Sequence, residues 1–294
     1  MNESKTIKPI VITDSCCGWE DEYAQLKEVP IIRFSYIFAG REYPDSGNEK
    51  ETSEFYQRLI NGEECTTSQA TSENYYTFFQ EYLSQERPII YIAVSSLLSA
   101  SYFSACQAKK RIMQENPQAD ITIIDSKAVC CGMRLLVEKA VDLRDEGKSK
   151  KDIVRWLQDH KLTVHLWLAL DNFEHLVKGG RVSPGASFLC NLINRKSILK
   201  LDKKGCIVPV GKCRKEKKLF KKLAKHVRKE AINPKEQTAV ITHAFCLERA
   251  ALLKEMLLEK VPFKDVQLCL MPAVVAAHTG PSGLLLGFFG KKRS

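Results

Sequence analysis

The sequence lacks the short motifs that mark common metal and enzyme sites. It has no Cys-x-x-Cys pair, and the adjacent cysteines Cys16-Cys17 and Cys130-Cys131 do not have the spacing of a structural zinc site. It has no Gly-x-Ser-x-Gly nucleophile elbow. Its nearest approach to a phosphate-binding loop, Gly205 to Gly211-Lys212, has the glycines one residue too far apart and Cys213 where Ser or Thr is needed. We therefore expect neither a metal site nor a nucleotide-binding loop.

Long hydrophobic runs are also absent. The longest apolar tract, Leu268 to Gly290, is interrupted by His278, Thr279 and a Gly-Pro-Ser turn, so we expect no integral membrane segment. The opening residues, MNESKTIKPIVITDS, are polar and then strand-like, without the apolar core of a signal peptide. The eleven cysteines are an odd number, and free thiols in a reducing compartment explain them most simply. These features predict a cytoplasmic protein.

The composition is that of a globular chain with an uneven charge distribution. Of the 294 residues, 44% are hydrophobic and 27% are charged, which is enough apolar material for two domains. The net charge of +10 comes from one segment, Arg195 to Lys229, which has 15 Lys and Arg against 2 Asp and Glu. This segment predicts either a solvated face or a surface for an acidic partner. Its only aromatic residue is Phe220, so it offers no base-stacking platform and we expect no nucleic acid.

The first half of the chain alternates short apolar runs with helical patterns. This alternation predicts βαβ units around a mostly parallel sheet with helices on both faces. The predicted strands are Pro9–Thr13, Pro30–Phe38, Pro88–Val94 and Ile121–Ile124. The predicted helices are Ser72–Ser84, Leu97–Asn116, Gly132–Arg144 and Lys148–Asp159.

The second half predicts an α+β domain with a mixed or antiparallel sheet. The turn Asp202-Lys203-Lys204-Gly205 predicts a hairpin between two strands. The predicted strands are Thr163–Leu170, Ser197–Leu201, Cys206–Val210, Thr238–Thr242, Val266–Val275 and Gly283–Phe289. The predicted helices are Phe173–Lys178, Lys215–Lys229 and Leu247–Glu259. We place the domain boundary near Lys161, which gives an N-terminal α/β domain over 1–160 and a C-terminal domain over 161–294.

Four polar segments follow predicted strands or open predicted helices. They are Thr66–Gln69, Ser95–Ser99, Asp125-Ser126 and His278–Pro281. Ligands bind beyond the carboxyl ends of parallel strands, and free N–H groups at a helix start favour an anion there. Ser95 and Ser96 fit such a site, although either serine can also act only as a helix cap. Because hydroxyls donate hydrogen bonds without adding charge, the set suits a carboxylate better than a phosphate.

Two other residues have alternative interpretations. The turn after His278, at Gly280-Pro281, predicts an imidazole placed at a strand end. His278, Ser96 and an Asp would then be the residues of a serine-dependent lipid ester or thioester hydrolase, although no elbow motif supports one. Arg181 follows a predicted helix end at Gly179, so it is either fixed on a rigid turn or solvated.

Six segments, taken together and in order, resemble the DegV family of bacterial fatty-acid-binding proteins. Each segment alone is weak evidence for the family, but the six together span essentially the whole chain. They are Ile12–Ser15, Thr67–Gln69, Ser95–Tyr102, Ile124–Lys127, Lys178–Ser183 and Ala277–Pro281.

The resemblance implies a two-domain DegV-like fold with a long-chain fatty acid, such as palmitate, buried between the domains. It implies that hydroxyls of Thr67, Ser95 and Ser96 bind the carboxylate. It also places His278 with Thr279, and Arg181, near the head group. The fatty acid is then the ligand, and no cofactor is expected.

The resemblance further implies a lipid-binding carrier that is not catalytic by itself. Such a carrier presents its fatty acid to a separate ATP-dependent fatty acid kinase subunit, which makes the acyl-phosphate for phospholipid metabolism. Arg214 resembles a family site for partner docking. Ala70, Leu98 and Ala100 depart from the family pattern near the head group, which implies altered acyl selectivity or lower affinity. Cys213-Arg214-Lys215 also lacks the family glycine.

Overall fold

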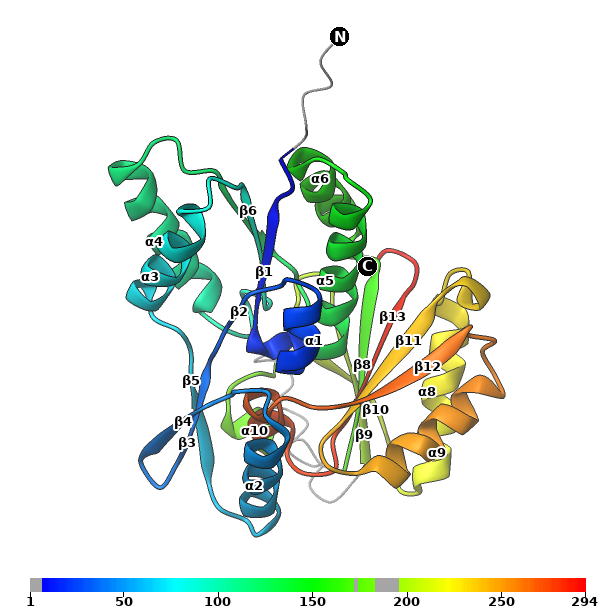
Figure 1. The fold of residues 1–294 in the computed structure, drawn as a ribbon. Helices are drawn as coiled ribbons and strands as arrows, with labels where there is room; N and C mark the ends of the chain where they lie inside the picture. Colours follow the sequence, from blue (N-terminus) through cyan, green and yellow to red (C-terminus); the bar gives the residue numbers. More distant parts are fainter. Residues whose placement is uncertain (1–6, 172–173, 183–195) are drawn as a thin grey trace.

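The structure, a computed structural model, describes residues 7–171, 174–182 and 196–294 (Figure 1). Its N-terminal part contains a four-stranded parallel sheet in the order β2-β1-β6-β7. The strands are β1 (Ile10–Asp14), β2 (Ile31–Ile32), β6 (Ile89–Ala93) and β7 (Ile121–Asp125). All residues of β1 and β6 are buried, as expected for strands covered on both faces. The predicted parallel α/β arrangement is confirmed.

Helices cover both faces of this sheet (Figure 1). One pair is α3 (Ser72–Leu83) and α4 (Ser101–Glu115), and the other is α5 (Cys130–Asp145) and α6 (Lys150–His160). The short η1 (Ser15–Cys17) and α1 (Asp21–Leu26) follow β1 directly. Helix α4 begins four residues later than predicted, because residues 95–100 form a turn beyond the end of β6.

The predicted strand Pro30–Phe38 is wrong as a single element. It divides into β2, which pairs in parallel with β1, and β3 (Ser35–Phe38), which belongs to a separate antiparallel sheet, β4-β3-β5. The division falls at Phe34, whose N–H donates to Ser15 Oγ and whose carbonyl accepts from Asp45 N–H. The other elements of this subdomain are β4 (Arg41–Pro44), α2 (Glu49–Ile60) and β5 (Cys65–Ser68).

The C-terminal part contains a six-stranded mixed sheet in the order β10-β9-β8-β13-β11-β12. Only β11 and β12 pair in parallel. Its strands are β8 (Val164–Leu170), β9 (Lys196–Leu201), β10 (Ile207–Cys213), β11 (Thr238–His243), β12 (Asp265–Leu270) and β13 (Leu284–Phe289). The predicted β9–β10 hairpin is confirmed, and Asp202 Oδ1 accepts from the N–H groups of Lys204 and Cys206 in its turn.

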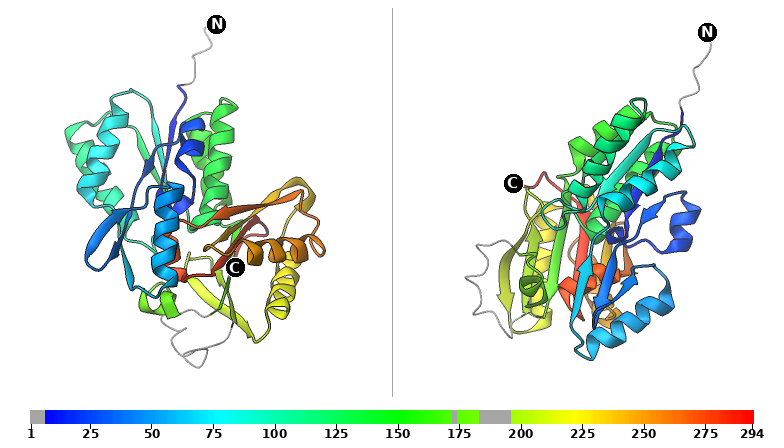
Figure 2. Two further views of the ribbon diagram at one scale, coloured as in Figure 1. Left: turned by 60° about the horizontal axis from the view of Figure 1, so that its bottom comes forward. Right: turned by 90° about the vertical axis from the view of Figure 1, so that its left-hand side faces the viewer.

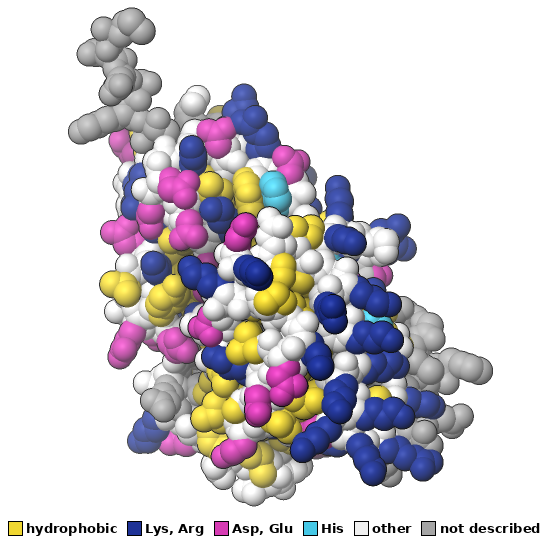
Figure 3. Space-filling model, turned by 90° about the vertical axis from the view of Figure 1, so that its right-hand side faces the viewer, with side chains coloured by type: hydrophobic (Ala, Val, Ile, Leu, Met, Phe, Trp, Pro, Cys, Tyr) yellow, Lys and Arg dark blue, Asp and Glu magenta, His cyan; other side chains and the backbone are white. Residues whose placement is uncertain are grey.

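The outer face of this sheet carries α8 (Glu216–Glu230) and α9 (Leu247–Leu258), with η3 (Pro234–Glu236) between them in the chain (Figure 2). The apolar side of α8 is fully buried, whereas all its lysines except the half-buried Lys222 are exposed. Figure 3 shows Lys and Arg side chains gathered over this side of the molecule. The exposed cations among the described residues of the basic segment are Lys203, Lys204, Lys212, Arg214, Lys215, Lys217, Lys218, Lys221, Lys225, Arg228 and Lys229. The basic segment is therefore the solvated face of an amphipathic helix and the adjoining hairpin.

The predicted strand Val266–Val275 is too long. Strand β12 ends at Leu270, and α10 (Ala273–Thr279) follows, because Pro272 starts the helix and Asp45 Oδ1 accepts from Ala273 N–H. His278 therefore lies in the last turn of a helix, and its predicted place at a strand end is wrong. The helix predicted over Phe173–Lys178 is α7 (Glu174–Lys178), and Phe173 lies outside the described residues.

The predicted domain boundary near Lys161 falls between α6 and β8, and it remains a prediction. Helix α5 joins the two parts, because it packs on β1 and β6 and also on β8, β11 and β13 (Figure 2). Within the described ranges, no helix is both long enough and apolar enough to cross a membrane.

The contact between α5 and β13 depends on a glycine. A Cβ atom on Gly287 would lie 2.9 Å from the backbone carbon of Cys131 and 3.0 Å from its oxygen. These backbone atoms of α5 cannot move aside as the end of a flexible side chain can. We expect Gly287→Ala to force α5 away from β13 and to lower the free energy of unfolding by about 1–3 kcal/mol. Urea denaturation measures this change.

Gly211→Ala in β10 is the matched control. A Cβ atom there meets only the flexible end of Lys222, which can move aside. We expect a change within about 0.5 kcal/mol for this variant. Equal unfolding curves for the two variants would contradict the role given to α5.

Candidate functional site

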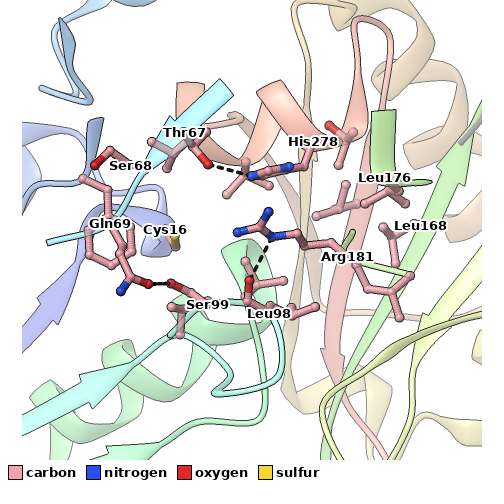
Figure 4. Close-up of a pocket in the computed structure, with 18 residues that line it drawn as sticks. Cys16, Thr67, Ser68, Gln69, Leu98, Ser99, Leu168, Leu176, Arg181 and His278 are labelled. Atoms are coloured by element: carbon pink, nitrogen blue, oxygen red, sulfur yellow. Dashed lines mark hydrogen bonds between the residues drawn. The ribbon is translucent and has the colours of Figure 1, made fainter. Parts of the chain in front are cut away.

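A cavity of about 260 Å³ lies between the two parts of the chain (Figure 4). The N-terminal part contributes η1, β5 and the segments after β2, β6 and β7, and the C-terminal part contributes β8, α7, β10, α10 and β13. Its apolar lining residues are Cys16, Phe34, Val94, Leu98, Val129, Leu168, Leu176, Ile207, Val274, Val275 and Leu285. Its polar lining residues are Thr67, Ser68, Gln69, Ser99, Arg181, His278 and Thr279. A mostly apolar cavity with a few polar groups is typical of a small-molecule site.

Thr67 and His278 meet across the two parts of the chain. Thr67 stands on β5, His278 stands on α10, and Thr67 Oγ1 lies 2.8 Å from His278 Nε2. Burial, together with the charge of Arg181 and the neighbouring His175, lowers the pKa of His278 to about 4. The imidazole is therefore neutral at pH 7, and it offers hydrogen bonds without a positive charge.

Gly179 allows the imidazole of His278 to approach α7. A Cβ atom on Gly179 would lie 2.4 Å from His278 Nδ1 and 3.1 Å from the carbonyl oxygen of His175. Any side chain at this position would push His278 out of its place beside Thr67. The Gly-Gly-Arg segment thus has two roles, since Gly179 makes room for the imidazole and Arg181 enters the cavity lining.

Arg181 supplies the charge at the polar end of the cavity. Its Nε donates to the carbonyl oxygen of Leu98 at 3.1 Å, and its Nη1 donates to the carbonyl oxygen of Gly179. These bonds fix the guanidinium between Leu98 and the Thr67–His278 pair (Figure 4). No Asp or Glu is among the described lining residues, so Arg181 gives the cavity one net positive charge.

Ser99 and Gln69 form a second polar group in the lining. Ser99 Oγ donates to Gln69 Oε1 at 3.2 Å, and Gln69 Nε2 donates to Ser104 Oγ at 3.3 Å (Figure 4). The carboxamide of Gln69 thereby fixes the Ser99 hydroxyl at the start of α4. Neither residue was singled out from the sequence, although both lie in segments that the sequence marked as polar strand ends.

The structure does not place Ser95 or Ser96 in the cavity lining. The hydroxyl of Ser95 is buried and donates to the carbonyl oxygen of Gly205 at 3.0 Å. The hydroxyl of Ser96 donates to Asp125 Oδ2 at 2.5 Å and accepts from Lys127 Nζ at 3.1 Å. Both hydroxyls are thus bonded within the protein, at the junction of β6, β7 and the β9–β10 hairpin.

The geometry needed for a serine hydrolase is not assembled. Ser96 bonds to a carboxylate and an ammonium, whereas His278 bonds to Thr67, and no hydrogen bond joins Ser96 to His278 among the described residues. A nucleophile must donate to its general base. The described contacts therefore do not support this alternative.

The remaining predicted residues lie in different places. Thr279 lines the cavity, and its hydroxyl donates to Met271 Sδ at 3.2 Å. Arg214 is exposed after β10 and does not line the cavity. Ser183, the last residue of one family-like segment, lies outside the described residues. In the part of the chain that the structure describes, no group of three or more His, Cys, Asp or Glu is placed to bind a metal ion.

Comparisons with known proteins agree with this architecture. Residues 8–290 match the family model described as "Uncharacterised protein, DegV family". A DegV domain-containing protein from Clostridium perfringens is 32% identical over 284 residues, which cover 96% of this chain and 98% of that protein.

Two solved structures extend the comparison to function. A DegV family protein from Thermus thermophilus, described by its fatty acid binding, has a TM-score of 0.86 at 25% identity and covers 96% of this chain and 100% of its own. DegV from Bacillus subtilis, described as a fatty acid binding protein, has a TM-score of 0.82 at 27% identity. The match covers 97% of this chain and 100% of that protein.

The fold and cavity define an α/β protein whose parallel and mixed sheets enclose a small, largely apolar space. The chain belongs to the DegV family. Its structural neighbours in that family bind fatty acids.

The neutral state of His278 generates a prediction about pH. Its folded pKa of about 4 lies below the ordinary 6.5, so the unfolded chain binds this proton more readily. The stability that the neutral imidazole contributes is complete above pH 6.5 and is lost as the pH falls toward 4. Between pH 7 and pH 5, we expect the wild type to lose about 2 kcal/mol more of its unfolding free energy than His278→Gln.

Chemical denaturation at a series of pH values measures this difference. Asp14 and Asp45, whose pKa burial raises to about 6, act in the opposite direction but are present in both proteins. Their contributions therefore cancel in the comparison. Parallel stability profiles for the two proteins would show that His278 is not held neutral.

Proposed function

We propose that the cavity binds one long-chain fatty acid, with the carboxylate at the polar end and the acyl chain along the apolar lining. The observation that carries the proposal is the charge pattern. One cation, Arg181, stands beside a neutral imidazole and hydroxyl groups, and no carboxylate lines the cavity among the described residues. One buried carboxylate balances this charge, and a buried anion needs such a partner.

The contacts proposed for the carboxylate are charge-assisted. Arg181 provides the ionic bond, and the Thr67 hydroxyl, paired with His278, provides a second hydrogen bond. Ser99 and Thr279 add hydroxyls to the same lining. This assignment keeps Thr67, His278, Thr279 and Arg181 from the sequence prediction. It replaces Ser95 and Ser96, which do not line the cavity, with Ser99, which does.

The acyl chain supplies most of the affinity in this proposal. Each buried methylene contributes about 0.8 kcal/mol, so a chain of about 15 methylenes contributes roughly 12 kcal/mol before ordering costs. The fatty acid binding described for the relatives from Thermus thermophilus and Bacillus subtilis supports the same class of ligand. Native mass spectrometry of the purified protein tests it. We expect a co-purifying long-chain acid, and a protein that contains none and takes up no added palmitate would overturn the proposal.

The head-group assignment predicts the effect of two substitutions. Arg181→Met keeps the length of the side chain but removes its charge, so we expect palmitate affinity to fall about 10- to 100-fold. Thr67→Val keeps the shape but removes the hydroxyl, and we expect a fall of about threefold to tenfold. Displacement of a fluorescent fatty acid measures both dissociation constants.

Ser96→Ala is the control for these substitutions, because its hydroxyl bonds to Asp125 and Lys127 outside the cavity. We expect its palmitate affinity to match the wild type. If Ser96→Ala weakened binding as much as Thr67→Val, the carboxylate would lie at the end of β6, as the sequence alone suggested.

We also propose that the protein presents its fatty acid to a separate ATP-dependent kinase subunit. The sequence has no Walker-type phosphate-binding loop, and in this proposal the second protein supplies the ATP site. Arg214 stands exposed on the basic face beside α8, away from the cavity, where a partner can reach it.

Arg214→Met separates docking from ligand binding. We expect normal palmitate affinity, because Arg214 does not line the cavity, and a loss of acyl-phosphate formation when the protein is mixed with a bacterial fatty acid kinase and ATP. Lys260→Met, which removes a charge beyond α9 and outside the basic segment, is the control. Equal acyl-phosphate formation by the wild type and both variants would contradict the docking role of Arg214.

A further inference from the structure

A second cavity, of about 290 Å³, has no role in the function proposed above. It is formed by η1 and residues 18–20 before α1, by the segments that flank β3 and β4, by α2, and by the end of β12 with the linker to α10. Three charged residues, Glu20, Arg33 and Asp45, are among its described lining residues, whereas the first cavity has Arg181. The residues used below are Ser15, Trp19, Arg33, Asp45, Thr52 and Met271.

The two cavities share a wall. Neighbouring residues line opposite sides of it, since Ser15 and Arg33 face the second cavity, whereas Cys16 and Phe34 face the first. Two contacts cross the wall directly. The N–H of Phe34 donates to Ser15 Oγ at 3.2 Å, and Thr279 Oγ1 donates to Met271 Sδ at 3.2 Å. At these points a single pair of residues separates the two spaces.

Two polar atoms of the second cavity's lining residues have no hydrogen-bond partner. They are Trp19 Nε1, a donor, and Asp45 Oδ2, and each residue is only 3% exposed. The other carboxylate oxygen of Asp45 accepts from Ala273 N–H. Nearly all buried polar groups in proteins are paired, and an unpaired one costs about 1–3 kcal/mol. A hydroxyl, which both donates and accepts, suits either of these atoms.

The charged lining of the second cavity disfavours an acyl chain whose far end is a methyl group. Hydrocarbon in this space would take solvent from the charged residues Glu20, Arg33 and Asp45, and it would leave Asp45 Oδ2 without a partner. Met271, by contrast, can open the wall, because its unbranched thioether side chain adopts several shapes at low cost. If an acyl chain enters the second cavity from the first, the lining there therefore fits a polar far end best.

We propose that the two cavities form one divided binding site, and that the second receives the hydroxylated far end of a long-chain acid. The ligand class is then a hydroxy fatty acid, with its carboxylate at Arg181 and its hydroxyl near Trp19 and Asp45. This inference rests on the function proposed above, because it assumes that the first cavity holds the acyl chain.

Dissociation constants for palmitate and 16-hydroxyhexadecanoate test the proposal. A site without partners for the hydroxyl would favour palmitate by about tenfold or more, since burying an unpaired hydroxyl is costly. We expect the wild type to bind the hydroxy acid at least as tightly as palmitate. Trp19→Phe removes the N–H donor. We expect this variant to bind the hydroxy acid about threefold to tenfold more weakly and to bind palmitate with the affinity of the wild type.

Trp156→Phe is the matched control, because Trp156 stacks on His160 in α6 and lines neither cavity. We expect it to bind both acids like the wild type. A crystal structure of the wild type with 16-hydroxyhexadecanoate gives a readout that needs no variant, and the proposal requires density for the hydroxyl in the second cavity.

The outcomes separate the two proposals. If the wild type binds palmitate well but binds the hydroxy acid at least tenfold more weakly, or if Trp19→Phe affects both acids equally, the chain ends at the wall and the inference is overturned. If no protein binds either acid, the function proposed above fails.

Discussion

The proposed ligand site depends on the cost of burying a carboxylate. An anion taken out of water needs a cation or several hydrogen-bond donors, and the groups beside it must not repel it. Arg181 meets the first condition, because two backbone carbonyls hold its guanidinium in the cavity lining. His278 contributes a neutral ring paired with Thr67, since burial and the nearby arginine keep it unprotonated. Together they give the polar end one positive charge.

The fold brings these residues together from distant parts of the sequence. Thr67 comes from the small antiparallel sheet, and His278 comes from α10, the helix that follows β12 of the C-terminal sheet. Helix α5 fixes the spacing of the two large sheets because it packs on both, and Gly287 lets it approach β13 closely. The cavity is thus a consequence of how the two parts pack, and neither part contains it alone.

Much of the architecture follows from local pattern. Continuous apolar runs identified the buried parallel strands, and the Asp202–Gly205 turn identified the β9–β10 hairpin correctly. The errors arose where a distant residue decides the local structure. Phe34 leaves the sheet because its backbone bonds to Ser15 and Asp45, and α10 starts where it does because Asp45 caps it from the other part of the chain.

The same limit applies to the site. The order of motifs indicated the DegV family, and it singled out Thr67, Arg181 and His278, which the structure places together in one cavity lining. The sequence could not show that Ser99 lines this cavity whereas Ser95 does not, because the hydroxyl of Ser95 bonds to a carbonyl 110 residues away. Gln69 gained its place beside Ser99 only through the packing of β5 near the start of α4.

Carbon-13 NMR of bound palmitate labelled at its carboxyl carbon tests the central claim most directly. If Arg181 and neutral donors surround the head group, the bound carboxyl resonance keeps the chemical shift of the ionised form as the pH falls from 7.5 to 5.5. A bound resonance at the position of the protonated acid over that range, or the absence of any bound resonance, would contradict the account.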